Sequence, residues 1–150
     1  MKPLLLGVGS PFGADRVGWS AVEALRPLLG NALAFECCDR PGAQLLSIMR
    51  GRRCVIIIDA LLGAAPGSLH VLRPADLARG AGTAVHGFGV ADALALADAL
   101  GDLPPHLMLI GVGVGTGEVL PSVDWDALAA RVGSLLGLCN TDEAQQNPWA

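Results

Sequence analysis

The chain has little of what nucleic-acid-binding proteins need. Tyrosine is missing, aromatic residues make up 4% of the 150 residues, and the net charge is −4 at pH 7. Nucleic-acid binders usually carry a basic stripe and ring faces that stack on bases. The densest basic stretch, Arg50–Arg53, precedes an apolar segment and is typical of a solvated helix end. We therefore expect no nucleic-acid partner.

Export signals, membrane-length apolar runs and paired cysteines are missing as well. After Met1–Lys2 a short apolar run leads directly into a glycine-rich turn, which is not a signal-peptide pattern. The longest apolar run, residues 54–65, is interrupted by Asp59 and is shorter than the roughly 20 residues of a membrane span. The four cysteines form no C-x-x-C pair, which argues against a zinc ribbon or a secreted disulfide framework. We expect a cytoplasmic monomer with reduced thiols and no membrane partner.

Aliphatic residues are what the chain has in excess. Hydrophobic residues make up 52% of the sequence, and a chain of this length buries enough surface to fold without disulfides or metals. This composition predicts one folded domain over residues 1–139. Residues 140–150 are polar and contain proline, which predicts a flexible tail.

Apolar runs and helical stripes alternate along most of the chain. This alternation predicts an α/β fold: a doubly wound, mostly parallel twisted sheet of about five strands with helices on both faces. The unbroken Val and Ile run of the third strand is typical of a strand covered on both sides. The expected strands are Pro3–Val8, Ala32–Cys38, Cys54–Ile58, Gly67–Leu72 (an edge strand) and Leu107–Val112. The expected helices are Val17–Leu29, Gly42–Met49, Val90–Leu100 and Trp125–Leu136, the last capped by Ser122 or Asp124.

The predicted order of strands and helices places three ionisable residues at one edge of the sheet. Asp15 follows the first strand and its loop, Asp59 directly follows the most apolar strand, and His86 precedes the helix at residues 90–100. Ligands of such folds bind beyond the carboxyl ends of the strands, where strand order reverses. An unpaired buried carboxylate costs several kcal/mol, which a divalent metal ion such as nickel, zinc or manganese would offset. The three residues are therefore our candidate metal ligands.

Each of the three also has a structural alternative. Asp15 is placed where a carboxylate caps a helix, and Asp59 is placed where it can accept hydrogen bonds from turn amides. A histidine before a helix is more often a capping or surface residue than a ligand. The metal-site prediction rests on the three residues occurring together.

The glycine-rich loop offers a different function. Gly7, Gly9 and Gly13 give G-x-G-x-x-x-G after a strand, one residue longer than a dinucleotide-binding fingerprint. Pro11 removes one backbone donor from the loop that would hold a pyrophosphate, whereas Asp39 follows the second strand as that fingerprint requires. A nucleotide-binding module is therefore one alternative.

Five segments, in order, resemble the hydrogenase maturation endopeptidase family. They are GVGSPFGADRVGWSAVEAL, CDRPGAQLLSIMRG, VIIIDALLGAAPGSLHVL, AVHGFGVADALALADAL and LMLIGVGVGTGEVL. They cover nearly the whole chain. The first, third and fourth segments together make the resemblance specific.

The resemblance implies an aspartic-type endopeptidase that removes the C-terminal extension of a nickel–iron hydrogenase large-subunit precursor after nickel insertion. It assigns the family's metal-contacting residues to Asp15, Asp59 and His86. The acid that the family has after its second strand corresponds to Asp39, which is our candidate catalytic residue. Nickel would be supplied by the substrate, and zinc or cadmium would fit the same ligands.

The first segment departs from the family pattern at three points. Ser10 stands for the family's asparagine, Ala14 stands for the first of two acids, and the loop is one residue shorter. Counting back from the helix assigns the metal contact to Asp15, whereas counting forward from Gly9 reaches Arg16, which cannot bind a cation. A non-catalytic chaperone that binds the precursor is therefore a further alternative.

Overall fold

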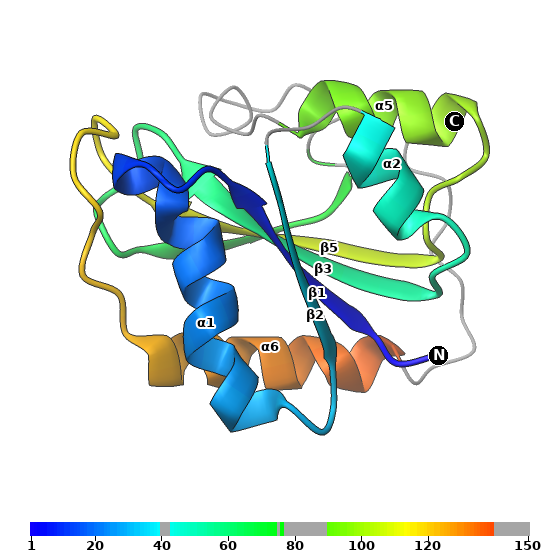
Figure 1. The fold of residues 1–150 in the computed structure, drawn as a ribbon, viewed down its shortest axis with the longest axis horizontal. Coiled ribbons are helices and arrows are strands. Elements are labelled where there is room, and N and C mark those ends of the chain that lie inside the picture. Colours follow the sequence, from blue (N-terminus) through cyan, green and yellow to red (C-terminus); the bar gives the residue numbers. More distant parts are fainter. Residues whose placement is uncertain (40–42, 75, 77–89, 140–150) are drawn as a thin grey trace.

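The structure is a computed structural model and describes residues 1–39, 43–74, 76 and 90–139. Five strands form one sheet in the order β2-β1-β3-β5-β4 (Figure 1). The strands are β1 (Leu4–Gly9), β2 (Ala34–Asp39), β3 (Cys54–Leu61), β4 (Leu69–Leu72) and β5 (His106–Gly113). The helices are η1 (Gly13–Arg16, a 3-10 helix), α1 (Val17–Leu29), α2 (Ala43–Met49), α5 (Ala91–Ala99) and α6 (Trp125–Cys139).

The sheet is parallel except at one edge. β1 pairs in parallel with β2 on one side and with β3 on the other, and β3 pairs in parallel with β5. Strand order therefore reverses between β1 and β3, which is where a doubly wound fold offers a ligand site. The predicted doubly wound α/β fold is confirmed.

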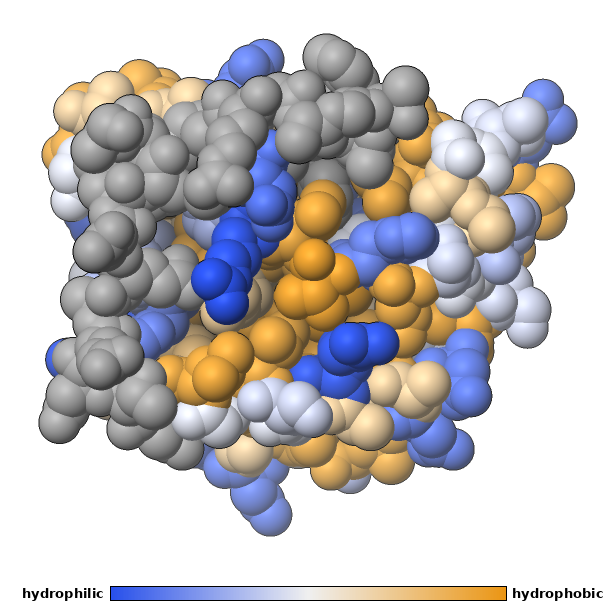
Figure 2. Space-filling view, turned by 180° about the vertical axis from the view of Figure 1, so that it is seen from behind, coloured by the Kyte–Doolittle hydropathy of each residue, from blue (hydrophilic) through white to orange (hydrophobic). Residues whose placement is uncertain are grey.

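Strand β4 is the antiparallel exception; the edge strand predicted at residues 67–72 is present at Leu69–Leu72, and its direction was not predicted. It pairs with β5, and its four residues are half-buried. Figure 2 views the molecule from behind, the side on which the edge strand β4 lies. It shows hydrophobic residues gathered across the middle of that face.

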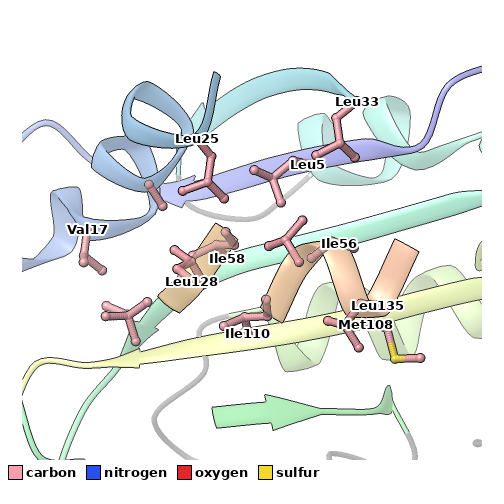
Figure 3. Packing of buried hydrophobic residues seen from close by; sticks show 14 of the residues in the cluster. Leu5, Val17, Leu25, Leu33, Ile56, Ile58, Met108, Ile110, Leu128 and Leu135 are labelled. Atoms are coloured by element: carbon pink, nitrogen blue, oxygen red, sulfur yellow. The ribbon is translucent and has the colours of Figure 1, made fainter. Parts of the chain in front are cut away.

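Two apolar clusters hold the layers together. One lies between the sheet and helices α2 and α5, and the other lies between the sheet and helices α1 and α6. In the second cluster, leucines of α1 and α6 meet isoleucines of β3 and β5, as Figure 3 shows for Leu25, Leu128, Ile58 and Ile110. Fully burying each such side chain stabilises the fold by about 1.5–3 kcal/mol. No helix among the described residues is long and apolar enough to cross a bilayer.

The prediction of four reduced cysteines is wrong for two of them. Cys54 at the start of β3 and Cys139 at the end of α6 form a disulfide, with their Cα atoms 6.0 Å apart, whereas Cys37 and Cys38 are free. Sequence spacing alone did not reveal the pair because the two residues are 85 positions apart and meet only when α6 packs on the sheet. The predicted cap of this helix is correct, since the Asp124 carboxylate accepts a hydrogen bond from the Ala127 N–H.

Candidate active site

Asp59 lies inside a strand rather than after it. The predicted third strand ended at Ile58, but β3 continues to Leu61 because β5 keeps pairing with it, Asp59 opposite Gly111. The Asp59 side chain is 6% exposed. Its Oδ1 accepts a hydrogen bond from the Ala60 N–H at 2.8 Å, as the turn-amide interpretation predicted. A buried carboxylate near the end of the sheet is the kind of group to which a cation can bind.

Asp15 reaches the same edge through unusually close backbone packing. A Cβ atom built on Gly9 would lie 2.0 Å from the Asp15 carbonyl oxygen, and one on Gly7 would lie 2.3 Å from the Gly18 carbonyl oxygen. A Cβ atom on Gly18 would lie 2.7 Å from the Ile58 carbonyl oxygen, one residue before Asp59. The glycines therefore let η1 and the start of α1 sit directly on the ends of β1 and β3. Because of this close packing, Asp15 is half-buried.

Alanine at Gly9 should destabilise the protein because its Cβ atom has no space beside the Asp15 carbonyl. We expect a loss of about 1–3 kcal/mol in the free energy of unfolding, the usual cost of overpacking. Gly133 in α6 has nothing within 4 Å of a built Cβ atom, so Gly133→Ala should instead stabilise by about 0.5–1 kcal/mol. Urea denaturation of both variants tests the pair; equal effects would contradict the packing argument.

His86 lies outside the described residues, so its position is not part of the structure. The helix that follows it lies on the relevant face of the sheet. Side chains alternate along a strand, so Asp59 projects to the same face as Ile57 and Leu61. Both belong to the cluster that also contains Val90, just before α5. Among the residues that the structure describes, no group of three or more histidine, cysteine or acidic side chains is arranged to hold a metal ion. The three-residue ligand set remains a prediction.

Asp39 ends β2 opposite Gly9, and its side chain is exposed. The preceding residue, Cys38, is 2% exposed, and Trp19 of α1 donates its indole N–H to the Cys38 carbonyl oxygen at 3.0 Å. This bond joins the end of β2 to the helix that follows Asp15. Burial, and after it the negative charge of Asp59, raise the pKa of the Cys38 thiol from 9.0 to about 11. The Cys38 thiol and the Asp59 carboxylate therefore interact electrostatically at this edge of the sheet.

The raised pKa of Cys38 makes stability depend on alkaline pH. Below pH 9.0 the thiol holds its proton in both states; between about 9 and 11 the unfolded chain releases it while the folded protein keeps it. The unfolded state then binds fewer protons, so the free energy of unfolding falls as pH rises, by about 1.4 kcal/mol per pH unit at most. Urea denaturation between pH 8 and pH ~11 should show a shallower decline for Cys38→Ala. An identical decline would contradict the assignment.

A serine–histidine contact is present that was not predicted from the sequence. The Ser68 Oγ lies 2.8 Å from the His70 Nε2, beside β4. However, the Ser68 hydroxyl donates its proton to the Ala65 carbonyl oxygen. In this arrangement the Ser68 oxygen accepts a hydrogen bond from the Nε2–H of His70, and a nitrogen that donates this bond does not act as the base that activates serine. This pair holds the turn before β4 and is not a catalytic dyad.

The glycine-rich loop does not have the hydrogen bonding of a phosphate cradle. The Ser10 N–H donates to the Asp15 carbonyl oxygen at 3.1 Å, and the Phe12 N–H points to the Ser10 Oγ at 3.4 Å. Two of the loop's donors are therefore used within the loop, and η1 separates it from α1. Ala14, the position of the missing acid, is 1% exposed and packs in the cluster under α1.

Comparison with known proteins gives one consistent result. The family model described as hydrogenase maturation protease matches residues 41–123. The hydrogenase 2 maturation protease of Escherichia coli strain K12 is 33% identical over 119 residues, covering 75% of this chain and 73% of that protein. The hydrogenase expression/formation protein HupD of Thiocapsa roseopersicina is 34% identical over 116 residues, which cover 73% of this chain. The chain spans only 52% of the length of HupD in that match.

A solved structure agrees over almost the full length. The hydrogenase maturating endopeptidase HybD from E. coli superposes with a TM-score of 0.71 at 27% identity, covering 93% of this chain and 94% of that one. The chain belongs to the hydrogenase maturation protease family.

Proposed function

We propose that the protein is an endopeptidase that removes the C-terminal extension of a nickel-loaded nickel–iron hydrogenase large-subunit precursor. The observation that carries the proposal is Asp59, a carboxylate 6% exposed in a strand that is otherwise apolar, at the edge where strand order reverses. Family membership supports the reaction class.

Nickel belongs to the substrate in this proposal. A cation held by the precursor would offset the desolvation of the Asp59 carboxylate, and Asp15 and His86 would complete the contact. Carboxylate oxygens and an imidazole nitrogen suit nickel, and also zinc or cadmium. Recognition through the metal would restrict cleavage to precursors that have already received nickel. The protein itself then needs no resident cofactor.

The reaction is hydrolysis of one peptide bond. A water molecule adds to the scissile carbonyl carbon, the C–N bond breaks, and a proton passes to the departing amine. We assign the proton transfer to Asp39, the exposed carboxylate at the end of β2, because an exposed acid can both reach a peptide and exchange its proton with water. The described Ser68–His70 pair is unsuited to serve as a nucleophile and base, which favours an attacking water.

We also propose that the protein works as a cytoplasmic monomer. The Cys54–Cys139 disulfide works against the cytoplasmic assignment, because reducing compartments keep most thiols free. The proposal therefore requires that the protein folds and cleaves with this pair reduced.

The deciding experiment is a cleavage assay with purified precursor in nickel-loaded and nickel-free forms. Mass spectrometry should show loss of a single C-terminal peptide from the nickel-loaded precursor and no change in the nickel-free one. Stable binding of the nickel-loaded precursor without cleavage would instead identify a chaperone. Thermal stabilisation by nucleotides, without any effect on the precursor, would favour the nucleotide-binding alternative.

A further inference from the structure

Large apolar side chains are exposed beside the candidate active site. Phe12 is 78% exposed, Leu62 is 51%, Val119 is 75% and Leu120 is 40%. We call these four residues the apolar rim. They come from three loops: Phe12 precedes η1, Leu62 follows β3, and the other two follow β5. Single exposed hydrophobic residues are ordinary, but several on adjoining loops mark an interaction site.

The three loops of the apolar rim pack against one another. The Gly63 N–H donates to the Gly115 carbonyl oxygen at 2.8 Å, which joins the loop after β3 to the loop after β5. A Cβ atom built on Gly117 would lie 2.7 Å from the Leu62 Cδ2, and one on Gly13 would lie 3.7 Å from the Glu118 carbonyl oxygen. Figure 1 shows these loops together at its left end, beyond the carboxyl ends of the parallel strands.

A groove continues from the apolar rim along α1. It has a volume of about 500 Å³ and is lined by residues of α1 and of the segment that leads into α6. Leu120 belongs to both the rim and the groove, and Trp125 and Ser20 line the groove farther along. Glu23, at its side, forms an ion pair with Arg16. The lining thus combines apolar contacts with polar groups, as a surface for an extended peptide requires.

We propose that the apolar rim and this groove are the docking surface for the hydrogenase precursor, which presents an apolar segment next to its scissile bond. The inference rests on the proposed function and names where the substrate is held. The rim residues are close in sequence to the candidate metal-contacting residues: Phe12 is three residues before Asp15, and Leu62 is three residues after Asp59. Asp59 projects to the α5 face of the sheet and the groove lies on the α1 face, so a precursor held in the groove would pass over this edge of the sheet to reach Asp59.

In the part of the chain that the structure describes, the other large exposed apolar side chains lie elsewhere. Met1 is at the N-terminus, Leu28 is near the end of α1, Leu96 and Leu100 are on and after α5, and Leu138 is near the end of α6. Leu28, 51% exposed, and Leu100, 58% exposed, provide the controls, because they are exposed apolar residues like Phe12 and Val119 but lie outside the rim. The rim is therefore distinguished by its location rather than by exposure alone.

The first measurement separates substrate binding from catalysis. In cleavage of the nickel-loaded precursor, Phe12→Ser combined with Val119→Ser should raise KM about tenfold or more and change kcat far less, because both lost contacts are to non-reacting parts of the substrate. The control Leu28→Ser combined with Leu100→Ser should leave both constants unchanged. Equal KM for the two double variants would overturn the proposal.

The second measurement does not depend on cleavage. Binding of fluorescently labelled nickel-free precursor, followed by anisotropy, should weaken about tenfold for the rim variant and remain at the wild-type value for the control. If no precursor is cleaved but this difference is found, the docking surface stands while the protease assignment fails. If binding is equal and only self-association of the protein changes on gel filtration, the rim is an interface between copies of this chain and the proposal is overturned.

Discussion

Asp59→Asn should reduce processing of the nickel-loaded precursor by at least about a hundredfold, because it removes the negative charge that would contact the nickel of the precursor. Asparagine has nearly the same shape and keeps an oxygen that can accept the Ala60 N–H, so the local backbone contact survives. It removes the buried negative charge. The variant should still fold, because the shape of the side chain and its contact with the Ala60 N–H are kept.

A second readout of the same variant is independent of activity. The negative charge of Asp59 raises the pKa of the Cys38 thiol, so its removal should lower that pKa. The value should stay above 9.0 because burial is the larger cause. Thiolate absorbance during alkaline titration, in a Cys37→Ser background, measures the change. Asp126→Asn, at an exposed position in α6, should alter neither processing nor the titration. Full processing by Asp59→Asn would remove the basis of the proposed function.

Local patterns were sufficient to predict most of the fold. Apolar runs predicted β1, β3 and β5, and an apolar stripe predicted α1. Both patterns indicate which residues are buried, and these residues form the core of the folded protein. The α1 stripe holds for Val17, Ala21 and Leu25, which are fully buried, but Leu28 is half-exposed beyond the edge of its cluster. Periodicity tells which face of a helix is buried and does not tell how far the neighbouring layer extends.

The candidate site was less predictable because its geometry depends on contacts between distant segments. The extension of β3 through Asp59 follows from its pairing with Gly111, about fifty residues later. The glycine spacing that resembled a phosphate loop serves instead to bring Asp15 and its backbone onto the ends of the strands, which only coordinates reveal. The contact between Ser68 and His70 likewise depends on the turn at Ala65.

Reduction of the Cys54–Cys139 disulfide should lower the free energy of unfolding by about 2–4 kcal/mol. The bond joins residues 85 positions apart, so the reduced unfolded chain gains much conformational freedom that the folded protein does not. Domains of this kind are usually stable by about 5–15 kcal/mol, so the reduced protein should remain folded. Urea denaturation with and without reductant, and of Cys139→Ser, measures the loss.

Processing should survive this loss almost unchanged. Cys54 begins β3, whereas Asp59 lies toward its other end, so the disulfide is at the opposite edge of the sheet from the candidate site. Cys37→Ser provides the control, since Cys37 is free and exposed and its replacement should shift neither stability nor cleavage. Loss of helical circular dichroism on reduction would show that the fold depends on the bond. A protein that cannot fold when reduced could not act in a reducing cytoplasm, and the cytoplasmic assignment would then fail while the reaction itself remained testable in oxidising buffer.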